Sequence, residues 1–109
     1  MASSTSPIVD LDTPNLEDAT DEEGVVLVDF HATWCGPCKQ MEPVLEAIAS
    51  SAEVKIVKVD VDQHQALAAE HQVRGVPTFL IFSNGELKER LVGYQPEPQL
   101  REIIESLSS

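Results

Sequence analysis

Residues 25–38 carry the stretch VVLVDFHATWCGPC, from which the expected fold can be worked out in both directions. Val25 to Phe30 is a nearly continuous apolar run of strand length, which is typical of a strand covered on both faces in the middle of a sheet. From Pro37 onward apolar residues recur every three or four positions, which predicts a helix that ends near Ser51 and is kinked at Pro43. The two cysteines of this stretch therefore lie between a central strand and the start of an amphipathic helix.

The chain of 109 residues has the length of one domain. Residues 1–7 are expected to be a flexible N-terminal segment, and residues 8–109 a single domain. Before the central strand, the sequence predicts a short strand around Ile8 to Leu11 and a short helix opened by Thr13 and Pro14, with Thr as the cap and Pro in the first turn.

Downstream of the long helix, the sequence predicts a second strand and a short helix. Residues 54–61 alternate in the manner of a strand, and Lys58 follows two apolar residues on its face. Asp62 is expected to cap a short helix through Ala66 to Glu70.

The C-terminal third predicts a hairpin and a closing helix. Asn84-Gly85 separates an apolar strand over residues 78–82 from a strand over residues 87–92, and this dipeptide is the strongest short-range signal for a hairpin. Apolar residues at helical spacing then predict a final helix over residues 100–107. Strands that alternate with helices and end in a hairpin imply an α/β domain with a mixed sheet sandwiched between helices.

The composition narrows the class of protein. Apolar residues make up 42% of the chain and charged residues 24%, so neither disorder nor membrane association is expected. Seven Lys and Arg against 19 Asp and Glu give a net charge of -12, which would repel a phosphate backbone, so nucleic acid is not an expected partner. Met1 to Pro7 show neither a basic region nor a long apolar run, and a cytoplasmic location is expected. The acidity fits either life in high salt or a solvated surface that selects basic partners.

Cys35 and Cys38 are the only cysteines, and their spacing indicates chemistry more than structural support. A bridge across so small a loop would stabilise the fold by about 2 kcal/mol at most. At a helix N-terminus, free backbone N–H groups and the helix dipole stabilise a thiolate, so Cys35 is the better nucleophile. Cys38 is one turn further on, at roughly 5 to 6 Å, which is close enough for a disulfide between the two.

Two other interpretations of the cysteine pair, a zinc site and a covalent haem site, fit the sequence less well than redox chemistry. Structural zinc needs four ligands, usually as two separated pairs, and beyond His31, Cys35 and Cys38 the sequence offers no second pair. Covalent haem would need a histidine directly after Cys38, where Lys39 stands. The sequence therefore predicts neither a metal nor a cofactor.

Five elements of the sequence, taken in order, carry a resemblance to a known family: the VDF strand at residues 28–30, WCGPC at residues 34–38, Lys39 and Pro43 in the following helix, VPT at residues 76–78, and Val92-Gly93. In these elements the chain resembles the thioredoxin family from about Ile8 to Leu107. The resemblance implies a five-stranded sheet with four helices. It also implies a monomer that reduces disulfides in client proteins, carries electrons in cell redox homeostasis and is re-reduced by a thioredoxin reductase. Gly36-Pro37 between the cysteines is the pairing seen in reducing members of the family.

The resemblance further implies roles for residues around the cysteines. Asp29 ends an otherwise apolar strand, and its pKa should be raised because a buried carboxylate is costly. In the family the matching acid moves protons to and from the second cysteine, and Lys58 matches the lysine beside that acid. Pro77 resembles a cis-proline that faces the cysteines and leaves the neighbouring backbone free to pair with an extended substrate segment. The expected surface for client proteins consists of Trp34, Gly75, Val76, Pro77 and Gly93.

His31 departs from the family pattern, in which a large aromatic residue, commonly Trp, stands at this position. Imidazole is smaller and titrates near pH 6.5, so packing beside the cysteines and the pH dependence of the thiols both depend on this residue. A packed, hydrogen-bonded histidine is the simpler interpretation. His64 and His71 fall on the predicted short helix and its exit, and their side chains are expected to face solvent.

A second function also fits the sequence, namely a thioredoxin-like binding module that stabilises a partner protein without redox turnover. Because both cysteines are present, this function would accompany the redox activity and would not replace it.

Overall fold

The computed structural model of the chain describes residues 8–108, and the prediction for residues 1–7 lies outside the described part. The elements follow the order β1 (Ile8–Asp10), α1 (Glu17–Thr20), β2 (Val25–His31), α2 (Gly36–Ser51), β3 (Val54–Asp60), α3 (Gln65–Glu70), β4 (Thr78–Ser83), β5 (Glu86–Val92) and α4 (Glu97–Ser108). The predicted five-stranded sheet with four helices is confirmed.

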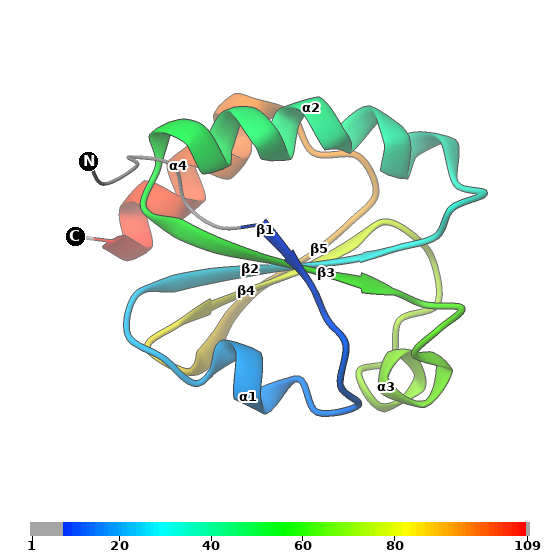
Figure 1. Cartoon of the computed structure of the whole chain (residues 1–109). Helices are drawn as coiled ribbons and strands as arrows, with labels where there is room; N and C mark the ends of the chain where they lie inside the picture. Colours follow the sequence, from blue (N-terminus) through cyan, green and yellow to red (C-terminus); the bar gives the residue numbers. More distant parts are fainter. Residues whose placement is uncertain (1–7, 109) are drawn as a thin grey trace.

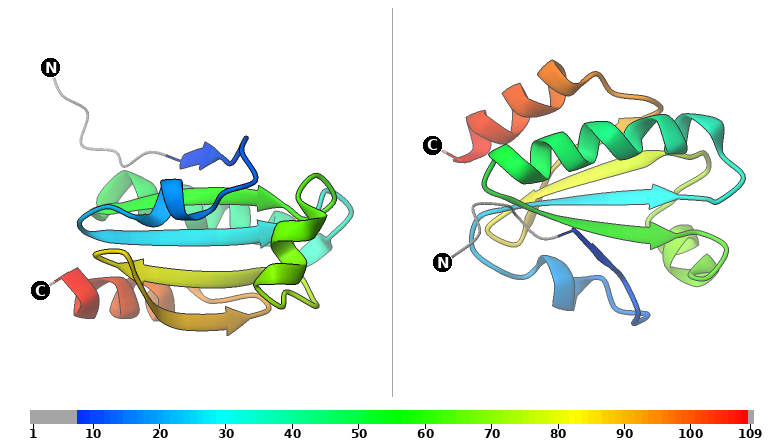
Figure 2. Two further views of the ribbon diagram at one scale, coloured as in Figure 1. Left: turned by 90° about the horizontal axis from the view of Figure 1, so that it is seen from below. Right: turned by 45° about the horizontal axis from the view of Figure 1, so that its top comes forward.

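The strands form one mixed sheet in the order β1-β3-β2-β4-β5, with β2 in the centre as predicted (Figure 1). β1, β3 and β2 are parallel to one another, whereas β4 runs antiparallel to β2 and β5 antiparallel to β4. α2 and α4 cover one face of the sheet, and α1 and α3 cover the other (Figure 2). This arrangement explains why the β2 sequence is apolar at almost every position.

The side chains of β2 divide between two cores. Leu27 packs on the α2 and α4 side, and its neighbour Val28 packs on the α1 and α3 side. Because the side chains of a strand alternate between faces, Asp29 and His31 belong to the same face as Leu27. The cysteine-bearing helix α2 covers this face, so both polar residues lie on the same side of the sheet as the cysteines.

The hairpin predicted from Asn84-Gly85 joins β4 to β5. Both turn residues have positive φ, 53° at Asn84 and 86° at Gly85, as a two-residue turn of this hand requires. Asn84 Oδ1 also accepts a hydrogen bond of 2.9 Å from the N–H of Gly24, which ties the hairpin to the entry of β2.

Two predicted helix starts were wrong. α1 begins at Glu17, after Asn15, whose Oδ1 accepts the Glu17 N–H at 2.9 Å, whereas Thr13 only donates to the carbonyl of Asn15. α3 begins after His64, and its first turn has no side-chain cap from Asp62. Thr13 thus forms a different local hydrogen bond from the one that capping would use, and the carboxylate of Asp62 accepts a hydrogen bond from the distant Trp34 instead.

The prediction that His64 and His71 face solvent was also wrong. Both residues are half-buried. His64 Nε2 lies 2.9 Å from the carbonyl oxygen of Leu11, and the ring of His71 packs beside Phe30 with centroids 6.0 Å apart.

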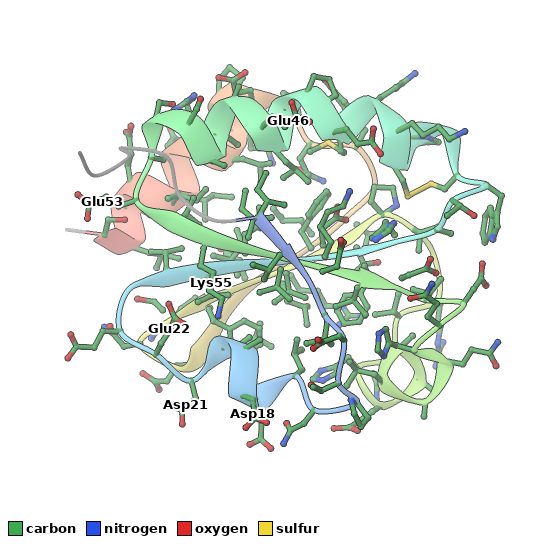
Figure 3. The ribbon with its side chains drawn as sticks, viewed as in Figure 1. Asp18, Asp21, Glu22, Glu46, Glu53 and Lys55 are labelled. Atoms are coloured by element: carbon green, nitrogen blue, oxygen red, sulfur yellow. A yellow bond between two sulfur atoms is a disulfide. The ribbon has the colours of Figure 1, made fainter. Side chains whose placement is uncertain are left out.

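Lys55 ties α1 to the sheet from β3. Its Nζ donates to the carbonyl of Ala19 and to Oε1 of Glu22, both at 3.1 Å (Figure 3). Among residues 8–108, no helix is both long enough and apolar enough to cross a membrane.

Candidate active site

The cysteine pair lies at the N-terminus of α2, where β2 has just ended (Figure 3). Cys35 is the cap residue, with extended φ and ψ of -94° and 115°, and Gly36 and Pro37 begin the helix. The N–H of Cys38 points at Sγ of Cys35 at 3.2 Å. Free N–H groups at a helix start stabilise negative charge on a neighbouring atom. The geometry therefore favours ionisation of the Cys35 sulfur in the reduced protein.

Cys35 and Cys38 form a disulfide with Cα atoms 5.3 Å apart, in agreement with the spacing predicted for one helical turn. Both residues are buried, and Ala32, Val61 and Val76 pack around them. The pair can thus open and close without displacing the backbone.

The loop before β4 faces Cys35. The Val76–Pro77 peptide bond is cis, as the family resemblance implied, and the carbonyl oxygen of Val76 lies 3.6 Å from Sγ of Cys35. Thr78 Oγ1 donates to the carbonyl of Gly75 at 2.7 Å, and the N–H of Gly93 donates to the carbonyl of Pro77 at 2.8 Å. These bonds bring Gly75, Val76, Pro77 and Gly93 together beside the cysteines, although they are far from Cys35 in sequence.

Trp34 is 69% exposed on the other side of Cys35. Its Nε1 donates to Oδ2 of Asp62 at 2.9 Å, which holds the indole ring over the surface. This role of Asp62 was not expected from the sequence, because the residue follows a strand end and its carboxylate suggested a helix cap. Val92, known from the sequence only as part of a motif, and Tyr94 flank Gly93 and are 64% and 47% exposed, and neither was expected to belong to this surface. Their exposure as large apolar residues could only be seen once β5 was placed at the sheet edge.

Asp29 lies under this surface and is only 1% exposed. Burial raises the pKa of its carboxyl from 3.8 to about 7, against the opposing effect of the positive charge on Lys58. Lys58 is directly opposite Asp29 in the β2–β3 register, so the predicted neighbour is in place. Lys58 Nζ is 4.0 Å from a carboxylate oxygen of Glu42 on α2. Among the described residues, no group donates a hydrogen bond to Oδ1 of Asp29.

His31 ends β2 on the same face as Asp29 and is half-buried. Burial and the nearby charge of Lys58 lower the pKa of its imidazole, although Asp60, Asp10 and Glu42 oppose this effect. Within residues 8–108, no group of three or more His, Cys, Asp or Glu side chains is placed to hold a metal ion.

Comparisons with known proteins bear on the chemistry of this pair. The family model described as thioredoxin matches residues 8–106. A thioredoxin of Staphylococcus aureus is 46% identical over 90 residues, which cover 81% of this chain and 86% of that protein. Among solved structures, a mutant thioredoxin from Halobacterium salinarum has a TM-score of 0.88 at 44% identity. A thioredoxin from Malassezia sympodialis has a TM-score of 0.83 at 35% identity. Each alignment spans 100% of this chain and 96% of the solved chain.

Proposed function

This chain belongs to the thioredoxin family and is an oxidoreductase that acts on disulfides through its Cys35–Cys38 pair, and from this premise we propose a role for each residue of the site. Cys35 is the attacking thiolate and Cys38 is the resolving thiol. The observation that carries this assignment is the position of Cys35 as the cap of α2, with the Cys38 N–H directed at its sulfur.

The first step is attack on a disulfide in a client protein. The Cys35 thiolate forms a bond to one client sulfur, the client disulfide breaks, and its other sulfur leaves as a thiolate. The helix start stabilises the Cys35 thiolate relative to the thiol, which raises the fraction of reactive sulfur. Gly36 and Pro37 contribute by starting the helix directly after the nucleophile.

The second step releases the client. Cys38 loses its proton and attacks the Cys35 sulfur, which forms the Cys35–Cys38 disulfide and breaks the bond to the client. The client leaves with both sulfurs reduced, and a reductase then returns two electrons to the pair. Thioredoxin reductase and disulfide-containing proteins are the partner classes that the family implies.

Asp29 takes the proton from Cys38 in this second step. A group that exchanges protons works best when its pKa is close to the working pH, and burial brings the Asp29 pKa to about 7. Lys58 supports the role because its charge limits how far burial raises that pKa. The carboxyl can therefore hold and release a proton under physiological conditions.

Client proteins bind over the surface formed by Trp34, Gly75, Val76 and Gly93, which includes the Val76–Pro77 peptide although the Pro77 ring itself is buried. Val76 precedes a proline, which has no N–H, and its own carbonyl faces Cys35. An extended client segment can pair with the Val76 backbone in the manner of an added strand, which brings its disulfide to the nucleophile. The exposed Trp34 supplies apolar contact area at the edge of this surface.

The chain works as a monomer in the cytoplasm, where the reducing environment keeps a dithiol available. Sedimentation of the reduced protein at several concentrations tests whether the chain is a monomer. A mass that doubles with concentration would refute it.

The roles of the two cysteines are tested with Cys35→Ser and Cys38→Ser in an assay that contains a protein disulfide, a reductase and a reductant. Both variants should lose turnover, and only Cys38→Ser should accumulate a covalent adduct with the client. Trapping by Cys35→Ser instead would reverse the assignment. Association with a partner that is stable, noncovalent and independent of either thiol would favour the alternative function as a binding module.

A further inference from the structure

A small cavity lies beside Cys38, on the face of the sheet that α2 covers. Its volume is about 160 Å³, and its lining includes His31, Cys38, Lys39, Glu42 and Lys58. Since one water molecule occupies about 30 Å³ in the liquid and needs two or more polar partners, a cavity of this size and lining has room for several waters. The second cysteine therefore shares this cavity with the imidazole of His31.

His31 lies between the buried acid and the surface. It comes two positions after Asp29 on β2, so both side chains are on the same face of the strand. Asp29 is almost fully buried, whereas His31 is half-buried. Along this face, a carboxyl group in the core is thus followed by an imidazole that reaches solvent.

The resolving step requires a group that can exchange protons with solvent. Cys38 must lose a proton when it attacks Cys35 and regain one when the pair is reduced again. Cys38 is only 5% exposed and Asp29 only 1%, so neither exchanges protons freely with bulk water. Lysine side chains keep their protons near neutral pH and free carboxylates bind them weakly, which leaves imidazole as the cavity group suited to pass a proton in both directions.

We propose that His31 relays protons between Cys38 and solvent through water in this cavity, as a second proton-transfer residue beside Asp29. The inference rests on the proposed roles of Cys38 and Asp29. During resolution the S–H bond of Cys38 breaks, and its proton passes to the neutral imidazole, either through water or by way of Asp29. The imidazolium then releases the proton to solvent. The Cys38 sulfur bonds to Cys35, the bond from Cys35 to the client breaks, and the client sulfur leaves as a thiolate that takes up a proton from water.

The electrostatic surroundings suit this role. Burial and Lys58 hold the pKa of His31 below its ordinary value, so its imidazole is neutral near pH 7 and ready to accept a proton. The negative charges of Asp60, Asp10 and Glu42 limit how far the pKa of His31 falls. The charged and titratable groups around His31 are Lys58 and Asp60 on β3, Asp10 on β1, and Cys38, Lys39 and Glu42 on α2. Asp29 precedes it by two positions on the same face of β2.

The test measures the two chemical steps separately by stopped flow. Reduced protein is first mixed at low pH with an aromatic disulfide whose thiolate is coloured, which leaves one aryl group on Cys35. A jump to neutral pH then starts resolution by Cys38, and absorbance reports release of the second coloured thiolate. The variants are His31→Gln, which retains a polar side chain, and His31→Ala, which opens space for a small base.

We expect the attack by Cys35 to keep its rate and the resolving step to slow about tenfold in both variants. General acid–base groups typically contribute about 10²–10⁴-fold, and Asp29 remains in place. Added imidazole should restore the resolving rate of His31→Ala, because it can enter the enlarged cavity. The control is His71→Ala, which removes another half-buried histidine and should neither slow resolution nor respond to imidazole.

An unchanged resolving rate in His31→Gln would overturn the proposal. So would equal slowing of both steps, or the absence of rescue by imidazole in His31→Ala, because either result would indicate that His31 acts only through packing. Failure of the proposed function would look different, because the wild-type protein would then either not take up the aryl group on Cys35 in the first phase or not release it in the second.

Discussion

The buried carboxyl of Asp29 should make the stability of the protein depend on pH in a way that Asp29→Asn removes. In the folded chain the carboxyl holds its proton up to about pH 7, whereas in the unfolded chain it releases it near the ordinary value of 3.8. Between these two values the folded state binds more protons than the unfolded state. The free energy of unfolding of the wild-type chain therefore falls as the pH rises through this range.

The size of this change in the free energy of unfolding follows from the pKa shift of Asp29. A pKa raised from 3.8 to about 7 corresponds, at 1.36 kcal/mol per unit, to about 4 kcal/mol of destabilisation above pH 7. None of this cost is present when the carboxyl is protonated in both states, at pH values below the ordinary one. Asn has nearly the same shape as protonated Asp and does not titrate. Relative to the wild type, Asp29→Asn should thus gain about 4 kcal/mol between about pH 4 and pH 9.

Denaturant unfolding of the oxidised proteins measures this difference, since neither cysteine titrates while the disulfide is closed. The control is Asp18→Asn, which removes an exposed carboxylate from α1 and so corrects for the loss of one negative charge. The pH-independent part of the substitution cancels, because only the change between the two pH values is compared. A difference between Asp29→Asn and wild type that stays constant within about 1 kcal/mol would mean that Asp29 is solvated in the folded chain.

Three further predictions concern stability. Ile48→Ala should lower the free energy of unfolding by about 2–5 kcal/mol in a denaturant titration, because Ile48 is fully buried in the core under α2. The control Glu46→Ala, at an exposed position of the same helix, should change it by less than about 0.5 kcal/mol. Stability should rise between low salt and about 1 M salt, because screening weakens repulsion in a chain of net charge -12; thermal melts that show no rise would count against a high-salt adaptation. Arg90 donates to the carbonyls of His71 at 2.8 Å and Gln72 at 2.6 Å. Arg90→Ala should therefore lower the free energy of unfolding by about 1 kcal/mol and speed proteolysis of the loop after α3. Arg90→Lys should lower it by less.

Most of the fold could be predicted because its strongest signals are local. The apolar run of β2, the alternation of β3 and the Asn84-Gly85 turn each identify a structure within a few residues. The two short helices were harder. At α1 the Glu17 N–H bonds to Asn15 and not to Thr13, and at α3 no side chain caps the first turn, because packing of the folded chain directs the Asp62 carboxylate to Trp34. The sequence alone does not contain that packing.

Some features of the candidate site could likewise be predicted from the sequence, and others could not. The cysteine pair, Asp29 and Lys58 could be identified from a motif and from polar residues within apolar strands. The bond from Trp34 to Asp62 could not be predicted, because it joins residues 28 positions apart that meet only when β3 ends beside the start of α2. The cavity beside Cys38 was equally out of reach, since its walls come from β2, β3 and α2.

The register between β2 and β3 links the stability of this protein to its chemistry. It pairs Asp29 with Lys58 and His31 with Asp60, and the same register sets Leu27 opposite Ile56 in the core. Because strand side chains alternate, a slip of one residue would turn Asp29 away from the cysteines and expose Leu27 to the wrong face. The cost of misplacing the apolar side chains therefore holds the buried acid in place, although the acid itself destabilises the fold near neutral pH. A core that packs in only one register is what keeps this carboxyl group buried on the face of the sheet that α2 covers.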